Sequence, residues 1–559
     1  MDDRKLLEKL TTEKEVAFEF QERRHEQWNQ NYELYRDFVR TNRLTQRQPV
    51  NFPIMKTSLR TLLANIDDPP SMEFKNLEGG EEAQKKEKIT NELWTETFDD
   101  LNFEDLDILD KKNVFLYGRS FKKLNFLDKS FDAEVLDNWD VLVDPKTNPM
   151  DLQTAKFLVH IHIFRSLREI LADDKYLQSG KDDLKVLLDT ETEGGLIAMP
   201  DAKEALQARQ ERLKTMGVEN FDDFGAADTI VELNEHYTLI WENKKFVRYV
   251  VITAVGAESA PKAILFKKPL KSVIGIDDWP LVTWADDMEL SDFWSDSKAD
   301  TVRTPNKILN IWLSQLLENR TLRNYGMHWF DSSKPEFIPT QFEPGPFKML
   351  PCPGNPNELT KQVDIPDLSE SLDEMMFIKG LIEEATSATP TKKGVEGKKK
   401  TFGEAELIQQ ESNENISGIA KFYKKAWKQF AQMWYDIIDA NVPDGEAIDL
   451  YKESTKGTGK MFKKSVMAKE WKSRAGYRIK VLSTSEQRQK NIEEINKWIA
   501  IKNQFPDNPK VQEMAERRIL EGLNVEKAEI DEAININKEQ NSLPGGLSMA
   551  PPQMNPQMR

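Results

Sequence analysis

The segment from Asp367 to Val442 constrains the fold more than any other part of the chain, because it reads as a helix, a basic loop and a long helix in succession. Apolar residues recur at helical spacing in its first part, at Leu368, Leu372, Met375, Ile378 and Ile382. The helical pattern then stops, and a segment without an apolar stripe follows. We therefore expect two helices separated by a loop of different character.

The loop from Ser387 to Thr401 contains five lysines and one glutamate. The lysines are Lys392, Lys393, Lys398, Lys399 and Lys400. Gly394 and Gly397 lie among them, so the segment is predicted to be a mobile, cationic loop. A positively charged loop held between two helices is suited to contact with a polyanion.

The helix after this loop is predicted to be long. It begins near Gly403 and ends at Pro443-Asp-Gly445, where proline and glycine stop helical periodicity. One apolar stripe follows its length, at Ile408, Ile416, Ile419, Tyr423, Trp427, Phe430, Trp434 and Ile437. At the standard rise, a helix of this kind spans roughly 55 Å.

Composition limits the class of protein. The chain has 559 residues, of which 39% are hydrophobic and 31% charged, a composition typical of globular proteins with a sizeable core. Its single cysteine, Cys352, excludes an internal disulfide and a cysteine-based zinc site. No apolar run is long enough to cross a bilayer, so no membrane association is expected. The formal net charge of −17 argues against a general nucleic-acid coat, but not against contact with DNA at one small basic feature.

The rest of the chain mixes helical and strand patterns, which predicts a helix-rich α+β fold. Three stretches read as strands in the first half: the residues from 114 to 143, from 156 to 164 and from 236 to 266, the last as a β-meander. A helix is predicted from Thr301 to Asn319, followed by short strands and turns. Strand patterns return from 448 to 482, helices run from 484 to about 538, and the tail is low in complexity.

The sequence contains no recognisable enzyme signature, and we expect no catalysis, cofactor or metal. His160 and His162 are expected on one face of a strand, but no third ligand is near them. The glycine–lysine segments at 394–398 and 457–460 lack the spacing and the preceding strand of a phosphate-binding loop. If a nuclease were present, its weak candidate metal ligands would be Asp277, Asp278, Asp286 and Asp287.

The order of these parts resembles the portal proteins of tailed bacteriophages, and the segments Trp28–Tyr35 and Asn113–Phe121 are similar in character to parts of that family. The resemblance rests on element order and covers nearly the whole chain. It implies these parts: an α+β wing (1–300), a first stem helix (301–324), a β-rich clip (325–365), a second stem helix (366–386), a tunnel loop (387–402), a long wing helix (403–442), a return segment to the wing (443–482), a helical crown (483–540) and a disordered tail (541–559).

The resemblance also implies a function. Portal proteins form a ring, a dodecamer in assembled heads, at one vertex of the capsid. Double-stranded DNA is packaged and later ejected through the channel of this head-to-tail connector. The large subunit of the terminase docks on the clip, and head-completion or adaptor proteins and the tail replace it. Further partners are the major capsid and scaffolding proteins, and the expected location is the virion, or the host cytoplasm during assembly.

Three sets of candidate site residues follow from the resemblance. Those expected to face DNA from the tunnel loop are Lys392, Lys393, Gly394, Gly397, Lys398, Lys399 and Lys400. Those expected at stem contacts, within or between subunits, are Leu309, Trp312, Leu316, Leu372, Met375 and Phe377. Those expected to pack between clips or under a docked partner are Phe330, Phe337, Phe342 and Phe347.

Two physical arguments stand beside the resemblance. The second stem helix is apolar nearly all round, because Met376, Phe377 and Leu381 widen its stripe, and such a helix needs neighbours on more than one side. An acidic protein with one lysine cluster can contact DNA without gripping it tightly. The alternative is a helical scaffold or adaptor protein of a virion without a DNA channel, in which the lysine loop is a solvated charge run.

Overall fold

The structure is a computed structural model, and the residues that it describes belong to two compact units. Unit 1 comprises Met1–Pro69 and Leu101–Asn441, and unit 2 comprises Pro70–Asp100 and Val442–Arg559. The described residues are 2–38, 50, 52–65, 71–127, 130–191, 230–255, 261–325, 328–330, 355, 360–362, 371–385, 402–453, 461–482, 495–502, 504, 511–512, 514–516 and 519.

Unit 1 contains a five-stranded antiparallel sheet in the order β4-β5-β6-β7-β8. Its strands are β4 (Val141–Val143), β5 (Phe157–Ser166), β6 (Ile230–Glu242), β7 (Lys245–Val255) and β8 (Pro261–Pro269). Sequence neighbours pair with each other throughout this sheet, so the predicted β-meander is confirmed.

A second sheet of unit 1 has three antiparallel strands in the order β3-β2-β9. They are β2 (Arg119–Leu127), β3 (Ser130–Leu136) and β9 (Leu281–Ala285). Gly118 directly precedes β2 with φ of +84°, and a Cβ there would lie 2.1 Å from the carbonyl oxygen of Ser295. Only glycine therefore fits this turn without displacing the segment that leads into α9.

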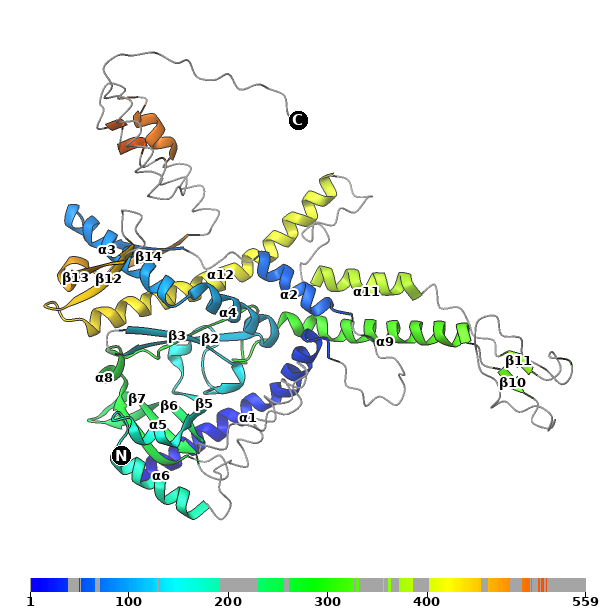
Figure 1. Cartoon of the computed structure of the whole chain (residues 1–559), viewed down its shortest axis with the longest axis horizontal. Coiled ribbons are helices and arrows are strands. Elements are labelled where there is room, and N and C mark those ends of the chain that lie inside the picture. Colours follow the sequence, from blue (N-terminus) through cyan, green and yellow to red (C-terminus); the bar gives the residue numbers. More distant parts are fainter. Residues whose placement is uncertain are drawn as a thin grey trace. The chain divides into compact units, whose positions relative to one another are not determined.

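The described helices of unit 1 lie around these sheets or extend away from them (Figure 1). They are α1 (Asp3–Tyr35), α2 (Ile54–Asn65), α4 (Phe103–Tyr117), α5 (Leu167–Ala172), α6 (Gln178–Glu191), α8 (Leu270–Ile274), α9 (Lys298–Tyr325), α11 (Ser371–Ala385) and α12 (Phe402–Asn441), with short 3₁₀ turns η1 (Asn138–Asp140) and η2 (Leu152–Thr154).

Two layers of helix cover the five-stranded sheet. Leu6 and Leu10 of α1 pack against Ile240 and Val251 on one face. On the other face, the core cluster joins α5 and α6 to β6, β7 and β8; its buried residues are Ile170, Tyr176, Leu184, Val231, Leu233, Ala254, Val255, Ala263 and Leu265. The even and odd positions of β6 thus face different helices, as the two-residue period of a strand requires.

Unit 2 contains one strand pair that is distant in sequence and one that is close in sequence. β1 (Ser71–Asn76) pairs with β14 (Tyr477–Leu482), and β12 (Ala447–Glu453) pairs with β13 (Met461–Met467). The described part of the unit also contains the helices α3 (Glu81–Asp100) and α13 (Ala468–Trp471), and residues 495–502 are helical. Its core includes Phe74, Trp94, Trp471 and Tyr477, and the Tyr477 hydroxyl donates to the Trp471 carbonyl at 2.5 Å.

The structure confirms a mixed helix and sheet fold, and it divides the chain into two units. Residues 70–100, predicted as part of the wing, share unit 2 with the predicted return segment at 443–482. The prediction that His160 and His162 share one strand face fails, because a bulge between His160 and Ile163 breaks the alternation and His162 has φ of +59°.

Candidate oligomer interface

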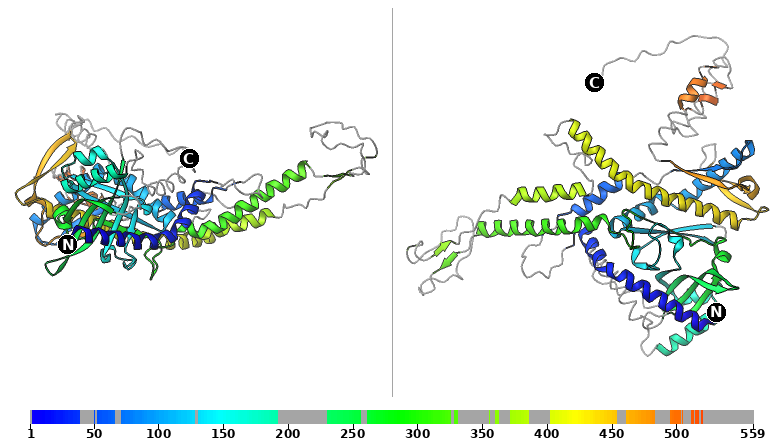
Figure 2. Two further views of the ribbon diagram at one scale, coloured as in Figure 1. Left: turned by 90° about the horizontal axis from the view of Figure 1, so that it is seen from below. Right: turned by 180° about the vertical axis from the view of Figure 1, so that it is seen from behind.

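Helices α9 and α11 lie side by side and extend away from the two sheets of unit 1 (Figures 1 and 2). At their far end β10 (His328–Phe330) pairs antiparallel with β11 (Thr360–Gln362). Helix α9, this two-stranded ladder and α11 follow one another along the chain in that order.

The first half of α9 is fixed to the body of unit 1. Val302 and Leu309 are buried, and Asn306 is fully covered between them. Arg303 contacts Asp300 at 2.6 Å, and Asp300 also accepts from the Asn31 amide of α1 at 3.0 Å. The direction in which α9 leaves the sheets is thus set by packing and by charge-assisted hydrogen bonds.

The segment that leads into α9 is also anchored. Arg24 of α1 donates to Asp292 at 3.0 Å, to Asp296 at 2.5 Å and to the Trp294 carbonyl at 2.8 Å. The Trp294 ring is buried and meets the Trp28 ring edge to face at 5.2 Å between centroids. The base of the α9–α11 hairpin is therefore rigid.

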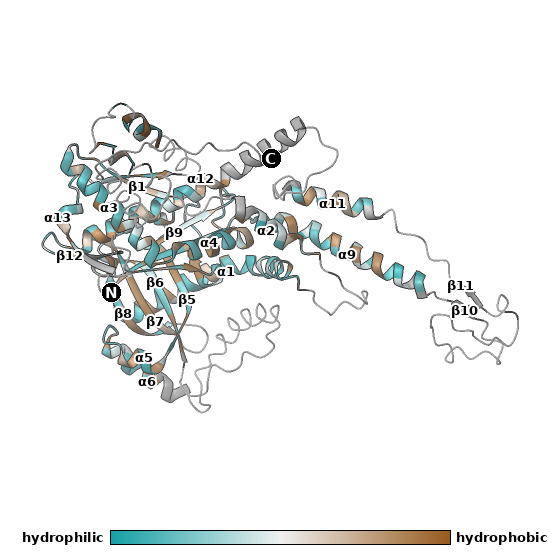
Figure 3. Cartoon of the chain, turned by 45° about the horizontal axis from the view of Figure 1, so that its top comes forward, coloured by the Kyte–Doolittle hydropathy of each residue, from teal (hydrophilic) through white to brown (hydrophobic). Residues whose placement is uncertain are grey.

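The outer surface of α11 carries three apolar side chains that are uncovered within the described part of the subunit, next to the exposed Asp373 and Glu374. Phe377 is 67% exposed, Met376 64% and Leu381 46%, whereas Ile382 is buried. Figure 3 shows hydrophobic residues along both α9 and α11. A surface helix normally buries its apolar stripe and exposes polar residues. The exposed apolar side chains of this helix are therefore typical of a contact surface for another protein chain.

The predicted stem residues are not equivalent in the structure. Leu309 is buried within the subunit, and Trp312, Leu316 and Met375 are partly buried. Phe377 faces solvent, and Leu372 belongs to α11 but its side chain lies outside the described residues. Their role in contacts between subunits stays a prediction.

Most of the other predicted residues lie outside the described part of the chain. Phe330 is the last residue of β10, while Phe337, Phe342 and Phe347 are not described. None of the seven tunnel-loop residues is described: Lys392, Lys393, Gly394, Gly397, Lys398, Lys399 and Lys400. The helices that flank this loop, α11 and α12, are both present.

The long helix α12 is held in the core of unit 1 by a buried carboxylate that the sequence reading missed. Asp107 of α4 accepts from the Tyr423 hydroxyl at 2.6 Å and from the Trp427 indole at 3.3 Å. Lys111 contacts the same carboxylate at 2.6 Å. Burial raises the pKa of the Asp107 carboxyl, and the charge of Lys111 opposes that shift.

A second buried pair lies one helical turn away on α4. Asp110 contacts Lys122 of β2 at 2.7 Å and accepts from the Trp284 indole of β9 at 2.8 Å. The Lys122 ammonium also lies 4.4 Å from the centre of the Trp427 ring. These contacts join α4, α12 and the three-stranded sheet, and they fix the C-terminal half of α12.

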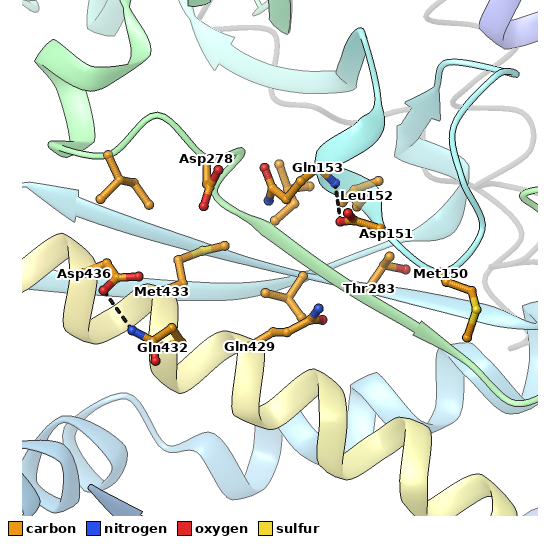
Figure 4. Close-up of a pocket in the computed structure, with 13 residues that line it drawn as sticks. Met150, Asp151, Leu152, Gln153, Asp278, Thr283, Gln429, Gln432, Met433 and Asp436 are labelled. Carbon is orange, nitrogen blue, oxygen red and sulfur yellow. Dashed lines mark hydrogen bonds between the residues drawn. The ribbon is translucent and has the colours of Figure 1, made fainter. Parts of the chain in front are cut away.

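A small cavity of about 180 Å³ lies between β9 and α12, and its lining includes Met150, Gln153 and Met433 (Figure 4). Three aspartates line it, but each already has a partner. Asp278 contacts Arg248 at 3.1 Å, Asp436 accepts from the Gln432 amide at 2.9 Å, and Asp151 accepts from the Gln153 backbone at 3.0 Å.

The aspartates considered for a nuclease do not form a common site in the structure. Asp278 belongs to the cavity wall, and Asp286 contacts Lys298 at 3.4 Å near the base of α9. Asp277 and Asp287 are exposed. Within the described ranges, no group of three or more histidine, cysteine or carboxylate side chains is placed to hold a metal ion.

No family model and no curated protein matches this chain. Among the helices that the structure describes, none combines the length and the apolar character that a bilayer crossing requires.

Proposed function

We propose that this chain is the subunit of a ring-shaped channel of the bacteriophage portal type, through which double-stranded DNA is packaged and ejected. The observation that carries the proposal is the apolar outer face of α11, on a hairpin that extends from an otherwise well-packed unit. The order of elements, from the α+β body through α9, the small β ladder and α11 to α12, supports it.

The physical reason for a ring is the position of the uncovered face. α11 packs on α9 on one side and exposes Met376, Phe377 and Leu381. Burying such a side chain stabilises an assembly by about 1.5 to 3 kcal/mol when it becomes fully covered. A contact between two different surfaces of identical subunits is heterologous, and it closes into a ring when the rotation per subunit divides a full turn. A dodecamer is the ring size that we expect in assembled heads.

The proposed channel meets DNA through the lysine loop that joins α11 to α12. Its five lysines interact with phosphates without reading base sequence, so DNA can slide past them. The chain has no bond-making role in this proposal and needs no cofactor. Motor activity belongs to the terminase, which docks on the segment around β10 and β11 and is later replaced by head-completion or adaptor proteins. Major capsid and scaffolding proteins are further partners of the ring, which acts in the virion and, during assembly, in the host cytoplasm.

A charge placed on the outer face of α11 tests the proposal. Phe377→Asp removes an exposed ring, so it leaves the fold of the subunit intact but puts a carboxylate into the proposed contact. We expect wild-type protein to sediment as a large assembly and the variant to sediment as monomers. Val186→Asp on α6, where the wild-type side chain is 62% exposed, is the matched control and keeps the assembly.

Two outcomes would contradict the proposal. Assembly of Phe377→Asp to the same extent as wild type shows that α11 is not at a subunit contact. A wild-type protein that is monomeric or dimeric at every concentration favours the adaptor alternative.

A further inference from the structure

The tip of the β6–β7 hairpin carries an exposed aromatic pair. Trp241 and Phe246 are cross-strand partners with ring centroids 4.7 Å apart, and they are 58% and 66% exposed. Asn243 and Lys244 form the turn with φ of +48° and +65°, as a tight two-residue hairpin requires. The pair is held by its own hairpin and leaves a large apolar surface to solvent.

This tip is also positively charged. Lys244 and Lys245 are exposed, and within the described residues neither has a carboxylate partner. The nearest acidic residue in the chain, Glu242, accepts from the Tyr249 hydroxyl at 2.7 Å. The tip therefore combines two aromatic rings with two solvent-exposed ammonium groups.

A complementary feature lies between β9 and α9. Leu290 is 98% exposed, and its neighbours Asp287 and Glu289 are exposed as well. The other carboxylates of this loop are occupied, because Asp286 contacts Lys298 and Asp292 contacts Arg24. The loop thus presents one exposed leucine directly after two exposed acidic side chains.

The hairpin tip and the Leu290 loop cannot meet within one subunit. The distance between them can be estimated along α1, because both regions contact this helix. Lys9 donates to Thr238 at 3.0 Å and to the Leu239 carbonyl, two residues before Trp241. Arg24 of the same helix holds Asp292, two residues after Leu290. Fifteen residues of helix separate Lys9 from Arg24, which corresponds to about 22 Å.

We propose that the Trp241–Phe246 tip of one subunit docks on the Leu290 loop of the next copy of this chain. Leu290 inserts against the aromatic pair, and Lys244 and Lys245 face Asp287 and Glu289. The contact joins two different surfaces, so it propagates in one direction around an assembly. It deepens the proposed function and rests on it: it is a second contact between neighbouring subunits, separate from α11.

Cysteine cross-linking tests this contact without touching the aromatic pair or Leu290. Lys245→Cys and Ser291→Cys are combined in a Cys352→Ser background, which removes the only natural cysteine. A short bis-maleimide is added, and the products are separated under denaturing conditions. We expect a ladder of covalent oligomers, because each subunit carries one half of the contact on each side.

Two mixing controls show the direction of the contact. Either single-cysteine variant alone gives no ladder, and an equal mixture of the two, assembled together, gives linked dimers only. Circular dichroism confirms that each variant is folded. The two readouts, the covalent ladder and rings seen by electron microscopy, separate this contact from the proposed function. If rings form but no covalent ladder appears, the contact is wrong and the channel proposal still stands. A ladder without rings supports the contact and contradicts the channel, whereas neither ladder nor rings overturns both.

A charge exchange tests the chemistry of the contact. Lys244→Glu, added to the cross-linking variant, lowers the yield of linked species at least about tenfold, because like charges then face each other. Glu289→Lys added to that variant restores the yield. A yield that Glu289→Lys fails to restore contradicts the pairing of these two sides.

Discussion

The C-terminal half of α12 and the outer face of α11 carry similar apolar stripes in sequence, yet they end in opposite environments. Tyr423, Trp427 and Trp434 of α12 are at most 1% exposed, whereas Phe377 and Met376 of α11 are more than 60% exposed. α12 packs against the three-stranded sheet and α4 of its own subunit. Within the described residues, α11 packs against α9 on one side. Apolar periodicity therefore shows that a helix needs neighbours, but not which chain supplies them.

The polar groups differ in the same way. Around α12, buried carboxylates are paired with ammonium, hydroxyl and indole donors, and removal of one partner leaves a charge without compensation. The exposed side of α11 carries Met376, Phe377 and Leu381 next to the exposed Asp373 and Glu374, and the three apolar side chains have no such network among them. Substitutions in the first region should therefore act on the folding of the subunit, and substitutions in the second on assembly.

The largest effect is expected at Asp107. Asp107→Leu leaves the buried ammonium of Lys111 and the donors on α12 without their carboxylate, so the free energy of unfolding should fall by about 3 to 5 kcal/mol. Denaturant titration measures this loss. Glu104→Ala on the exposed side of α4 is the control and should change the free energy by less than about 0.5 kcal/mol. A loss below 1 kcal/mol for Asp107→Leu shows that the network does not hold α12.

Truncation of an aromatic ring in each helix compares the two regions directly. Trp434→Ala opens a cavity under α12, because the ring is fully buried, and should lower the free energy of unfolding by about 3 to 5 kcal/mol. Phe377→Ala should leave unfolding of the isolated subunit within about 0.5 kcal/mol of wild type and weaken assembly. Equal destabilisation of the subunit by both changes removes the distinction between them.

Acid should act on the body of unit 1 through His236. This imidazole is fully buried beside Thr253, and burial lowers its pKa from 6.5 to about 3, with the charge of Lys14 acting in the same direction. The unfolded chain binds a proton near pH 6.5 and the folded chain does not, so stability is present above pH 6.5 and is lost as the pH falls toward 3. Between pH 6 and 5 the loss should be about 1.4 kcal/mol per unit from this group. His236→Gln should flatten that slope, and an unchanged slope would mean that another group is responsible.

The smallest effect on assembly is expected from the lysine loop. Replacement of its five lysines by serine should leave rings intact, because the stem contact does not include them. Binding of duplex DNA should weaken, and the slope of log affinity against log salt should decrease by about 0.9 for each phosphate contact removed. Filter binding at several salt concentrations measures the slope. If affinity and slope both match wild type, these lysines do not line the channel.

Local patterns were enough to predict the elements that depend on near neighbours in sequence. The β6–β7–β8 meander, α9 and α12 follow from periodicity and turn residues, and their bounds agree with the pattern within a few residues. α11 was predicted to be apolar nearly all round; the three residues that widen its stripe are exposed, but so are Asp373 and Glu374. That excess of apolar residues was the available signal for a surface that the subunit does not cover.

The pairing of distant strands and the burial of charged side chains could not be predicted from local sequence patterns. β1 pairs with β14 across some four hundred residues, so nothing local indicated that residues 70–100 belong to unit 2. Asp107, Asp110 and Lys122 read as surface residues because charged side chains usually are, and only their partners on other elements make burial tolerable. The bulge at His162 likewise depends on the fit between neighbouring strands.

Electron microscopy of the purified protein tests the central claim most directly, because a channel requires a closed ring around an axial hole. The account predicts rings for the wild type and for Val186→Asp, and dispersed single subunits for Phe377→Asp. Compact monomers or dimers from wild-type protein, or rings from Phe377→Asp that are indistinguishable from those of wild type, would contradict it.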